Sequence, residues 1–97
     1  QLTFDDITLD ATTHRVFRDG DEIKLGPTEF RLLGVLIEKP GRVLSRDQLL
    51  DLVWGRDIYV DSRTVDVHVG RLRKSLMKKN TATDPIRTVR GAGYSLG

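Results

Sequence analysis

The residues between positions 61 and 79 combine arginines, a histidine and aliphatic side chains, a set of groups suited to contacting nucleic acid. Wound as a helix, the segment has an apolar face that needs a core, formed by Val65, Val69, Leu72 and Leu76. Its opposite face is mainly basic and is formed by Arg63, Val67, Gly70, Arg71, Lys74 and Lys78. Arginine can fork onto guanine in the major groove, and an aliphatic group can contact the methyl of thymine. The pattern indicates a DNA reader, although a core helix with a solvated cationic side has the same pattern.

The distribution of charge favours a polyanionic partner. The net charge of the whole chain is only +2, but the two halves differ in sign. Residues 1–61 carry eight basic and twelve acidic side chains, a net charge of −4. Residues 62–97 carry eight basic and two acidic side chains, a net charge of +6. A basic half of this kind is typical of a surface that binds nucleic acid. A charge dipole without a partner is the alternative interpretation.

Enzymatic and metal chemistry have no support in the residue pattern. The chain has no cysteine, which excludes disulfides and thiolate metal sites, and its only histidines are His14 and His68. No paired carboxylates on one face and no nucleophile beside a base can be identified. Four aspartates near the N-terminus are typical of turns rather than of an acid–base pair or a calcium loop: Asp5, Asp6, Asp19 and Asp21. We therefore expect no enzyme, no cofactor and no metal site.

Residues 1–25 predict a small antiparallel sheet. Asp19-Gly20-Asp21 lies between alternating apolar and polar runs, and Asp-Gly is a strong signal for a hairpin turn. The expected short strands are Leu2–Phe4, Ile7–Leu9, Arg15–Arg18 and Glu22–Leu25.

Two helices are predicted between residues 27 and 54. Pro27 suits the first turn of a helix, and Pro40-Gly41 would end it. The core stripe of this first helix is Phe30, Leu32, Leu33, Val35, Leu36 and Ile37. Arg42–Leu44 is expected to add one short strand. Ser45 and Gln48 then form a capping box, and the second helix continues through Leu49, Leu50, Leu52 and Val53 to Trp54 before Gly55 ends it.

The third helix is the basic segment that begins at the expected N-cap Asp61-Ser62. Alternation over Thr64–Val69 is also a strand pattern, but the cap and the later leucines favour a helix over 62–79. A polar loop over 80–85 leads to a hairpin over 86–96, which turns at Gly91-Ala92-Gly93. The predicted class is α+β: a winged helix-turn-helix in one domain, 1–97, with an N-terminal sheet (1–25), a three-helix core (27–79) and a wing hairpin (86–96).

Residues 22–96 resemble the effector domain of OmpR/PhoB-type response regulators. The similarity lies in the blocks Leu25–Leu33, Ser45–Leu50, Val53-Trp54-Gly55, Arg63–Val69 with Arg71–Lys74, and Val89–Tyr94. Within that family, the blocks are most similar to those of the phosphate-regulon members. The resemblance implies sequence-specific DNA binding and transcription regulation in a bacterial two-component system. It also implies a phosphorelay receiver domain that this chain does not contain.

The resemblance also implies a role for each matching residue. Arg71 is expected to read a base, and Val67 to contact a thymine methyl. Arg90, near the tip of the hairpin, is expected to enter the minor groove. Phosphate or backbone contacts are expected from Trp54, Arg63, Thr64, His68, Arg73, Lys74, Thr88 and Tyr94. RNA polymerase, through its sigma or alpha subunit, is expected at the loop formed by Gly55, Arg56, Asp57, Ile58, Tyr59 and Val60.

Several of these residues have simpler interpretations. Trp54 could be a core aromatic residue, His68 a partly buried helix histidine, and Tyr94 a side chain that packs the wing onto the body. Lys78 and Lys79 suit any helix C-terminus. Two departures from the family pattern are Gly70, where a close member has arginine, and Ser95, where a basic residue is common.

Partners and location follow from the same resemblance. We expect head-to-tail pairs on direct-repeat DNA, a mostly monomeric free domain, and contact with the receiver domain of the full-length protein. The absence of a long apolar run or a signal-peptide pattern favours the cytoplasm, with the protein at the nucleoid. A protein-interaction module that has lost DNA binding is the alternative function, and the intact basic face argues against it.

Overall fold

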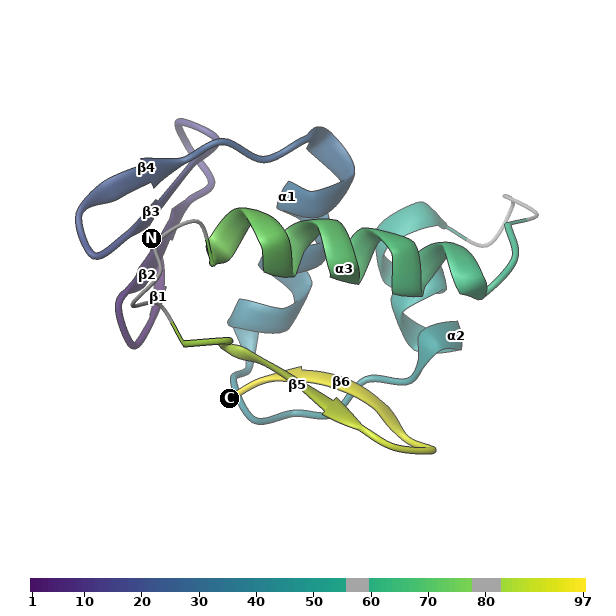
Figure 1. Ribbon diagram of the computed structural model, residues 1–97. Coiled ribbons are helices and arrows are strands. Elements are labelled where there is room, and N and C mark those ends of the chain that lie inside the picture. The colour runs from purple at the N-terminus through teal and green to yellow at the C-terminus, as the bar shows by residue number, and fades with distance from the viewer. Residues whose placement is uncertain (56–59, 78–82) are drawn as a thin grey trace.

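The computed structural model describes residues 1–55, 60–77 and 83–97. A four-stranded sheet lies at one end, three helical segments form the middle, and a hairpin runs beneath the longest helix (Figure 1). The elements are β1 (Leu2–Phe4), β2 (Ile7–Asp10), β3 (Arg15–Arg18), β4 (Asp21–Ile23), α1 (Pro27–Glu38), α2 (Arg46–Leu49), η1 (Leu50–Trp54), α3 (Arg63–Leu76), β5 (Ile86–Val89) and β6 (Gly93–Leu96). The predicted winged helix-turn-helix class is confirmed.

The N-terminal sheet is an antiparallel meander in the order β1-β2-β3-β4. Asp19 and Gly20 have φ angles of 52° and 81°, the positive values that a two-residue hairpin turn requires, so the predicted hairpin is confirmed. The last strand ends at Ile23, two residues before the predicted end at Leu25. Alternation directs Val16 of β3 into the core, and Arg18 points to the same side with only 6% of its surface exposed.

The four apolar residues of α3 decide the conflict between helix and strand in that segment. Val65, Val69, Leu72 and Leu76 are all at most 1% exposed and pack in the core with leucines of α1. Burial of such side chains is worth about 1.5–3 kcal/mol each, whereas a β-branched residue loses at most about 0.7 kcal/mol of helix propensity. Packing therefore outweighs local preference, and the helix is favoured.

The N-terminal cap of α3 lies at the predicted Asp61-Ser62, but the C-terminal end differs from the prediction. Ser62 has helical backbone angles and its side chain accepts no hydrogen bond, whereas Asp61 Oδ1 accepts from the Arg63 N–H at 3.0 Å. Asp61 is thus the capping side chain. The helix ends at Leu76 with Met77 as its C-cap, short of the predicted residue 79. Lys78, Lys79 and residues 80–82 lie outside the described residues.

The second helical segment keeps its predicted cap but changes its pitch. Ser45 Oγ accepts from the Gln48 N–H at 3.1 Å, and Gln48 Oε1 accepts from the Ser45 N–H at 2.8 Å, as a capping box requires. The last turn, η1, is π-helical, and the Gly55 N–H bonds the Leu50 carbonyl at 3.0 Å. Within this turn, which holds more residues than an α turn, Leu52 faces away from the core and is 55% exposed.

The wing is joined to the body by backbone hydrogen bonds, and the closest approach is at Leu44. Leu44 and Tyr94 exchange two backbone hydrogen bonds of 2.8 and 2.9 Å. A Cβ on Gly93 would lie 1.9 Å from the Leu44 carbonyl oxygen, so only glycine fits between β6 and this segment. The predicted strand at 42–44 is therefore wrong in extent, since it is reduced to a single bridge at Leu44.

Candidate nucleic-acid interface

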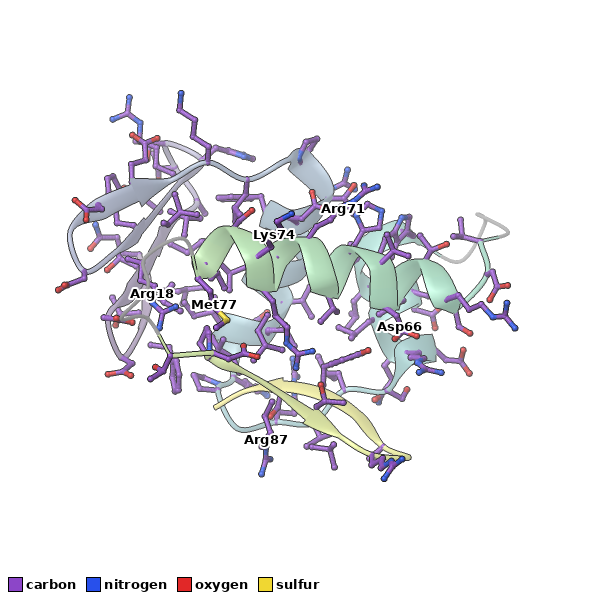
Figure 2. The ribbon with its side chains drawn as sticks, viewed as in Figure 1. Arg18, Asp66, Arg71, Lys74, Met77 and Arg87 are labelled. Carbon is purple, nitrogen blue, oxygen red and sulfur yellow. The ribbon has the colours of Figure 1, made fainter. Side chains whose placement is uncertain are left out.

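The outward face of α3 is exposed along its whole length. Its residues are Arg63, Val67, Gly70, Arg71 and Lys74, all of them exposed. Val67, the one large apolar side chain among them, is 51% exposed. Arg71 and Lys74 project from the side of α3 that faces away from the wing (Figure 2). No hydrogen bond or ion pair with another described residue engages the three cationic side chains, so they are available to an external anion.

The wing adds a second basic position beside a groove. Arg90 is exposed at the turn between β5 and β6. A groove of about 440 Å³ separates the wing from the start of α2, and its lining includes Arg46, Ser62, Thr88 and Arg90. One carboxylate, Asp47, also lines the groove, but cationic and hydroxyl groups on both walls outnumber it and make the groove suitable for a chain of phosphates.

Asp66 connects three elements on the flank of α3 that faces the wing. Its Oδ1 accepts from Arg46 Nε of α2 at 3.0 Å and from the Tyr94 hydroxyl of β6 at 2.5 Å. Figure 2 shows Asp66 on the lower side of α3, toward α2 and the wing. Sequence reasoning did not select Arg46 or Asp66, because nothing in the sequence indicates that these residues, 20 apart in the chain, form a pair.

Tyr94 is a buried phenol whose hydroxyl already has a partner. Only 7% of the residue is exposed. Burial raises the pKa of Tyr94 above 10.0, and the hydrogen bond to Asp66 and its charge raise it further, while Arg46 acts in the opposite direction. The phenol therefore stays neutral and donates to Asp66. This geometry favours the simpler interpretation, in which Tyr94 packs the wing onto the body.

Arg73 is hydrogen-bonded to the wing. Its Nη2 donates to the Ile86 carbonyl at 3.0 Å and to Thr88 Oγ1, both on β5. Its Nε lies 3.1 Å from Asp84 Oδ2 in an ion pair without hydrogen-bond geometry. Its guanidinium carbon lies 5.8 Å from the centre of the Tyr94 ring, within the range of a cation–π contact.

His68 and Trp54 form a cluster on the other flank of α3. His68 Nδ1 is hydrogen-bonded to Glu29 Oε1 of α1, and 18% and 11% of the two side chains are exposed. The rings of Trp54 and His68 are tilted at 58° with their centres 5.3 Å apart. His68 is thus the partly buried helix histidine of the simpler interpretation, and Trp54 packs against it.

The structure therefore divides the predicted site residues into two groups. The exposed, unpaired group lies on the outward face of α3 and at the wing tip: Arg63, Val67, Arg71, Lys74 and Arg90. The second group contacts other parts of the protein: Trp54, His68, Arg73, Thr88 and Tyr94. Thr64 is half-buried beside His68. Of the predicted polymerase loop, Gly55 and Val60 are described, and residues 56–59 lie outside the described residues.

Arg18 is a third structurally important residue that the sequence analysis did not identify. Its Nη1 donates to the Leu76 carbonyl at the end of α3 at 2.7 Å, and its Nη2 donates to the Thr83 carbonyl at 2.6 Å. Its Nε lies 3.2 Å from Asp6 Oδ1. A signal was present, because alternation from buried Val16 places position 18 on the core side of β3.

The described residues contain neither a metal-binding cluster nor a membrane-spanning helix. No group of three or more histidine, cysteine, aspartate or glutamate side chains there could hold a metal ion. No helix there is long and apolar enough to cross a membrane.

The family model for the C-terminal domain of transcriptional regulatory proteins matches residues 20–96. The chain belongs to this family. These are the OmpR/PhoB-type domains, DNA-binding domains of transcription factors rather than enzymes. The predicted family, its function class and the absence of an enzyme are thereby confirmed.

Relatives in the family include phosphate-regulon regulators, as the motif blocks predicted. The phosphate regulon transcriptional regulatory protein PhoB of Rhizobium meliloti strain 1021 is 70% identical over 91 residues, which are 94% of this chain and 40% of that protein. PhoB of Escherichia coli strain K12 is 49% identical over 88 residues, which are 91% of this chain and 38% of that protein. The chain therefore spans about two fifths of the length of these relatives.

Solved structures of OmpR/PhoB-type domains have the same architecture. The DNA-binding domain of response regulator AdeR, in complex with an intercistronic region, has a TM-score of 0.87 and is 31% identical in sequence. The match covers 97% of this chain and 96% of the AdeR chain. The DNA-binding domain of Klebsiella pneumoniae RstA, in complex with the RstA box, has a TM-score of 0.85 and is 32% identical in sequence. The match covers 99% of this chain and 95% of the RstA chain.

Proposed function

We propose that this OmpR/PhoB-type domain binds double-stranded DNA sequence-specifically, with α3 in the major groove and the wing in the minor groove. The observation that supports it best is the outward face of α3. Three cationic side chains and one apolar side chain are exposed there, and none of the cations is paired with a described residue. A solvated face would not need Val67 to be half exposed at its centre, whereas a thymine methyl gives that side chain a partner.

Within this face, the residues have different tasks. Arg71 forks onto a guanine, and Val67 contacts a thymine methyl, so these two residues supply specificity. Arg63 and Lys74 contact phosphates along the groove walls and supply affinity that depends on salt. Thr64 and Trp54 add contacts at the rim of the interface. His68 and Tyr94 contribute mainly by holding their neighbours in place, since each is already hydrogen-bonded within the protein.

The groove beside the wing accommodates the strand that separates the two DNA grooves. A sugar–phosphate strand would run between Arg46 on α2 and Thr88 on the wing, which brings Arg90 to the minor groove beyond it. A narrow minor groove has an enhanced negative potential and therefore attracts an inserted arginine. Arg46 is thus a further phosphate contact in this proposal.

The wider role follows from the relatives. AdeR and RstA domains have been captured with an intercistronic region and the RstA box, respectively. We infer that the full-length protein is a two-component response regulator with a receiver domain, located in the cytoplasm at the nucleoid. The proposal also includes two interactions of this protein. Its DNA-binding domains form head-to-tail pairs on direct-repeat DNA, and residues 55–60 contact RNA polymerase.

The test compares two arginines on a duplex selected from a random pool. Arg71→Ala should weaken binding to the selected duplex by about 1–3 kcal/mol and relax the choice of one base, with little loss on random duplex. Arg15→Ala is the matched control, because Arg15 is an exposed arginine on the N-terminal sheet. If Arg71→Ala weakened binding equally on the selected and the random duplex, Arg71 would make only an electrostatic contact and would not read a base. Affinity that does not fall with added salt would contradict phosphate binding and favour a protein-interaction module.

A further inference from the structure

We propose that Arg73 acts on DNA through the wing: it is a positioning residue that holds the wing alongside α3, and it does not contact a phosphate. The proposal rests on the proposed DNA-binding function and specifies how the wing takes part in it. The starting observation is that Arg73 lies outside the exposed face of α3 and is turned toward β5.

The contacts of Arg73 direct its Nη2 and Nε atoms toward β5 and Asp84. One Nη nitrogen serves two acceptors on β5, and the Nε atom is buried beside Asp84. About a quarter of the side chain (27%) is exposed. Lys74, the next residue, is exposed and unpaired among the described residues. Two adjacent cations thus have different environments: Arg73 is engaged with the wing, whereas Lys74 is not.

The wing is held at two points along one flank of α3. Asp66 accepts from the Tyr94 hydroxyl, and Arg73 contacts Asp84 and Thr88. Asp66 and Arg73 are seven positions apart, which is about 10 Å along a helix axis. Two anchors at this spacing fix the direction of the hairpin as well as its distance from α3.

The second anchor acts on the part of the wing that carries Arg90. Thr88 and Tyr94 are direct cross-strand partners, and Arg73 contacts both of them. Arg90 follows Thr88 by two residues at the start of the turn. Loss of Arg73 would therefore release β5 from α3 while Leu44 and Asp66 still hold Tyr94 of β6. Arg90, at the end of β5, would then bind the minor groove with a larger loss of conformational freedom.

The experiment is a double-mutant cycle between Arg73 and Arg90 on the selected duplex. In the parent domain, Arg90→Ala should weaken binding by about tenfold, a size typical of one specific contact. In the Arg73→Ala background, the same change should cost less than about twofold, because residues that act through one element are not additive. Arg73→Lys, which keeps the charge but cannot reproduce the forked contact, should behave as Arg73→Ala.

Lys74→Ala is the matched control for this cycle. Lys74 is adjacent to Arg73 and carries the same charge, but it faces outward. Its effect should add to that of Arg90→Ala, and it should reduce the salt dependence of binding by about one phosphate contact. Preserved affinity in Arg73→Lys, together with additive losses for Arg73→Ala and Arg90→Ala, would overturn the positioning role and make Arg73 a phosphate contact.

Asp84→Asn gives a second test. The change in DNA affinity that we expect has the opposite sign to the change that electrostatics alone would cause. Asp84 Oδ1 accepts from the Ile86 N–H at 3.0 Å, and an asparagine oxygen can keep that bond while the charge beside Arg73 is lost. Removal of a negative charge should strengthen DNA binding by electrostatics alone, whereas a loosened wing should weaken it. Weaker binding of a variant with unchanged thermal stability supports the proposal, and tighter binding overturns it. A parent domain without salt-dependent DNA binding would overturn the proposed function itself.

Discussion

Arg18 and Arg73 clamp α3 to its neighbours at two different places. Arg18 reaches from β3 to the Leu76 carbonyl at the end of α3 and to the Thr83 carbonyl (Figure 2). Arg73 reaches from α3 to Asp84, Ile86 and Thr88. Both arginines therefore hold the same stretch, residues 83–88, as it enters the wing.

The two clamps differ in their exposure to water. Arg18 is 6% exposed, and its guanidinium satisfies two backbone carbonyls from separate segments of the chain. Arg73 is 27% exposed, whereas the carboxylates paired with the two arginines, Asp6 and Asp84, are similarly exposed at 39% and 38%. Water and salt screen the second clamp more strongly than the first. The link between the sheet and α3 is thus less sensitive to salt than the link between α3 and the wing.

Arg18→Met should give the largest loss of stability. The change leaves two backbone carbonyls and Asp6 without their partner, and each unpaired buried group costs about 1–3 kcal/mol. Because Asp6 is 39% exposed and can regain water, we expect the free energy of unfolding to fall by about 2–4 kcal/mol in total. Urea unfolding measures the loss. Arg15→Met, at an exposed position of the same strand, should change stability by less than about 0.5 kcal/mol; similar values for the two variants would contradict the clamp.

Arg73→Met should cost less, about 1–2 kcal/mol, because solvent already screens part of the contact. The same urea measurement in 1 M salt should sharpen the contrast. Salt should reduce the difference between Arg73→Met and the parent domain but leave the effect of Arg18→Met nearly unchanged. Equal effects at both salt concentrations would show that the wing is held as firmly as the sheet.

The sequence predicted the elements of this contrast but not the contacts between them. The hairpin at Asp19-Gly20, the capping box at Ser45 and the apolar stripe of α3 are local signals, and each needs only neighbouring residues to be recognised. The outward face followed from the same periodicity, so Val67 and Arg71 lie where the helix pattern placed them.

The missed features depend on residues far apart in the chain. Arg18 and Leu76 are 58 positions apart, and Arg46 and Asp66 are 20 positions apart. The sequence alone does not say which charged groups the fold brings together. The family resemblance assigned Arg73 a phosphate contact, and only the path of β5 shows that its guanidinium faces the wing.

Tyr94→Phe should have a smaller effect that depends on pH. Removal of the hydroxyl leaves Asp66 with Arg46 as its partner, so we expect a loss of about 0.5–1.5 kcal/mol at neutral pH. The folded state favours the neutral phenol and raises its pKa above 10.0. Its contribution is therefore complete below about pH 10 and decreases as the pH rises through the pKa of the folded state. Chemical unfolding between pH 8 and 11 should show this decline in the parent domain and a shallower one in Tyr94→Phe.

Gly70→Ala should give the smallest effect and the opposite sign. The places where Arg18 and Arg73 hold α3 are in contact with other parts of the protein, but the outward face at Gly70 is open. A Cβ there would have no other atom within 4 Å. Gly70 also has a helical backbone without a positive φ, so alanine should stabilise the free domain by about 0.5–1 kcal/mol through helix propensity alone. Gly34→Ala is the matched control in α1, where a Cβ would make an ordinary 3.9 Å contact with Leu9. Thermal unfolding should show similar gains for both variants; a loss at Gly70 alone would mean that the outward face packs against part of the protein after all.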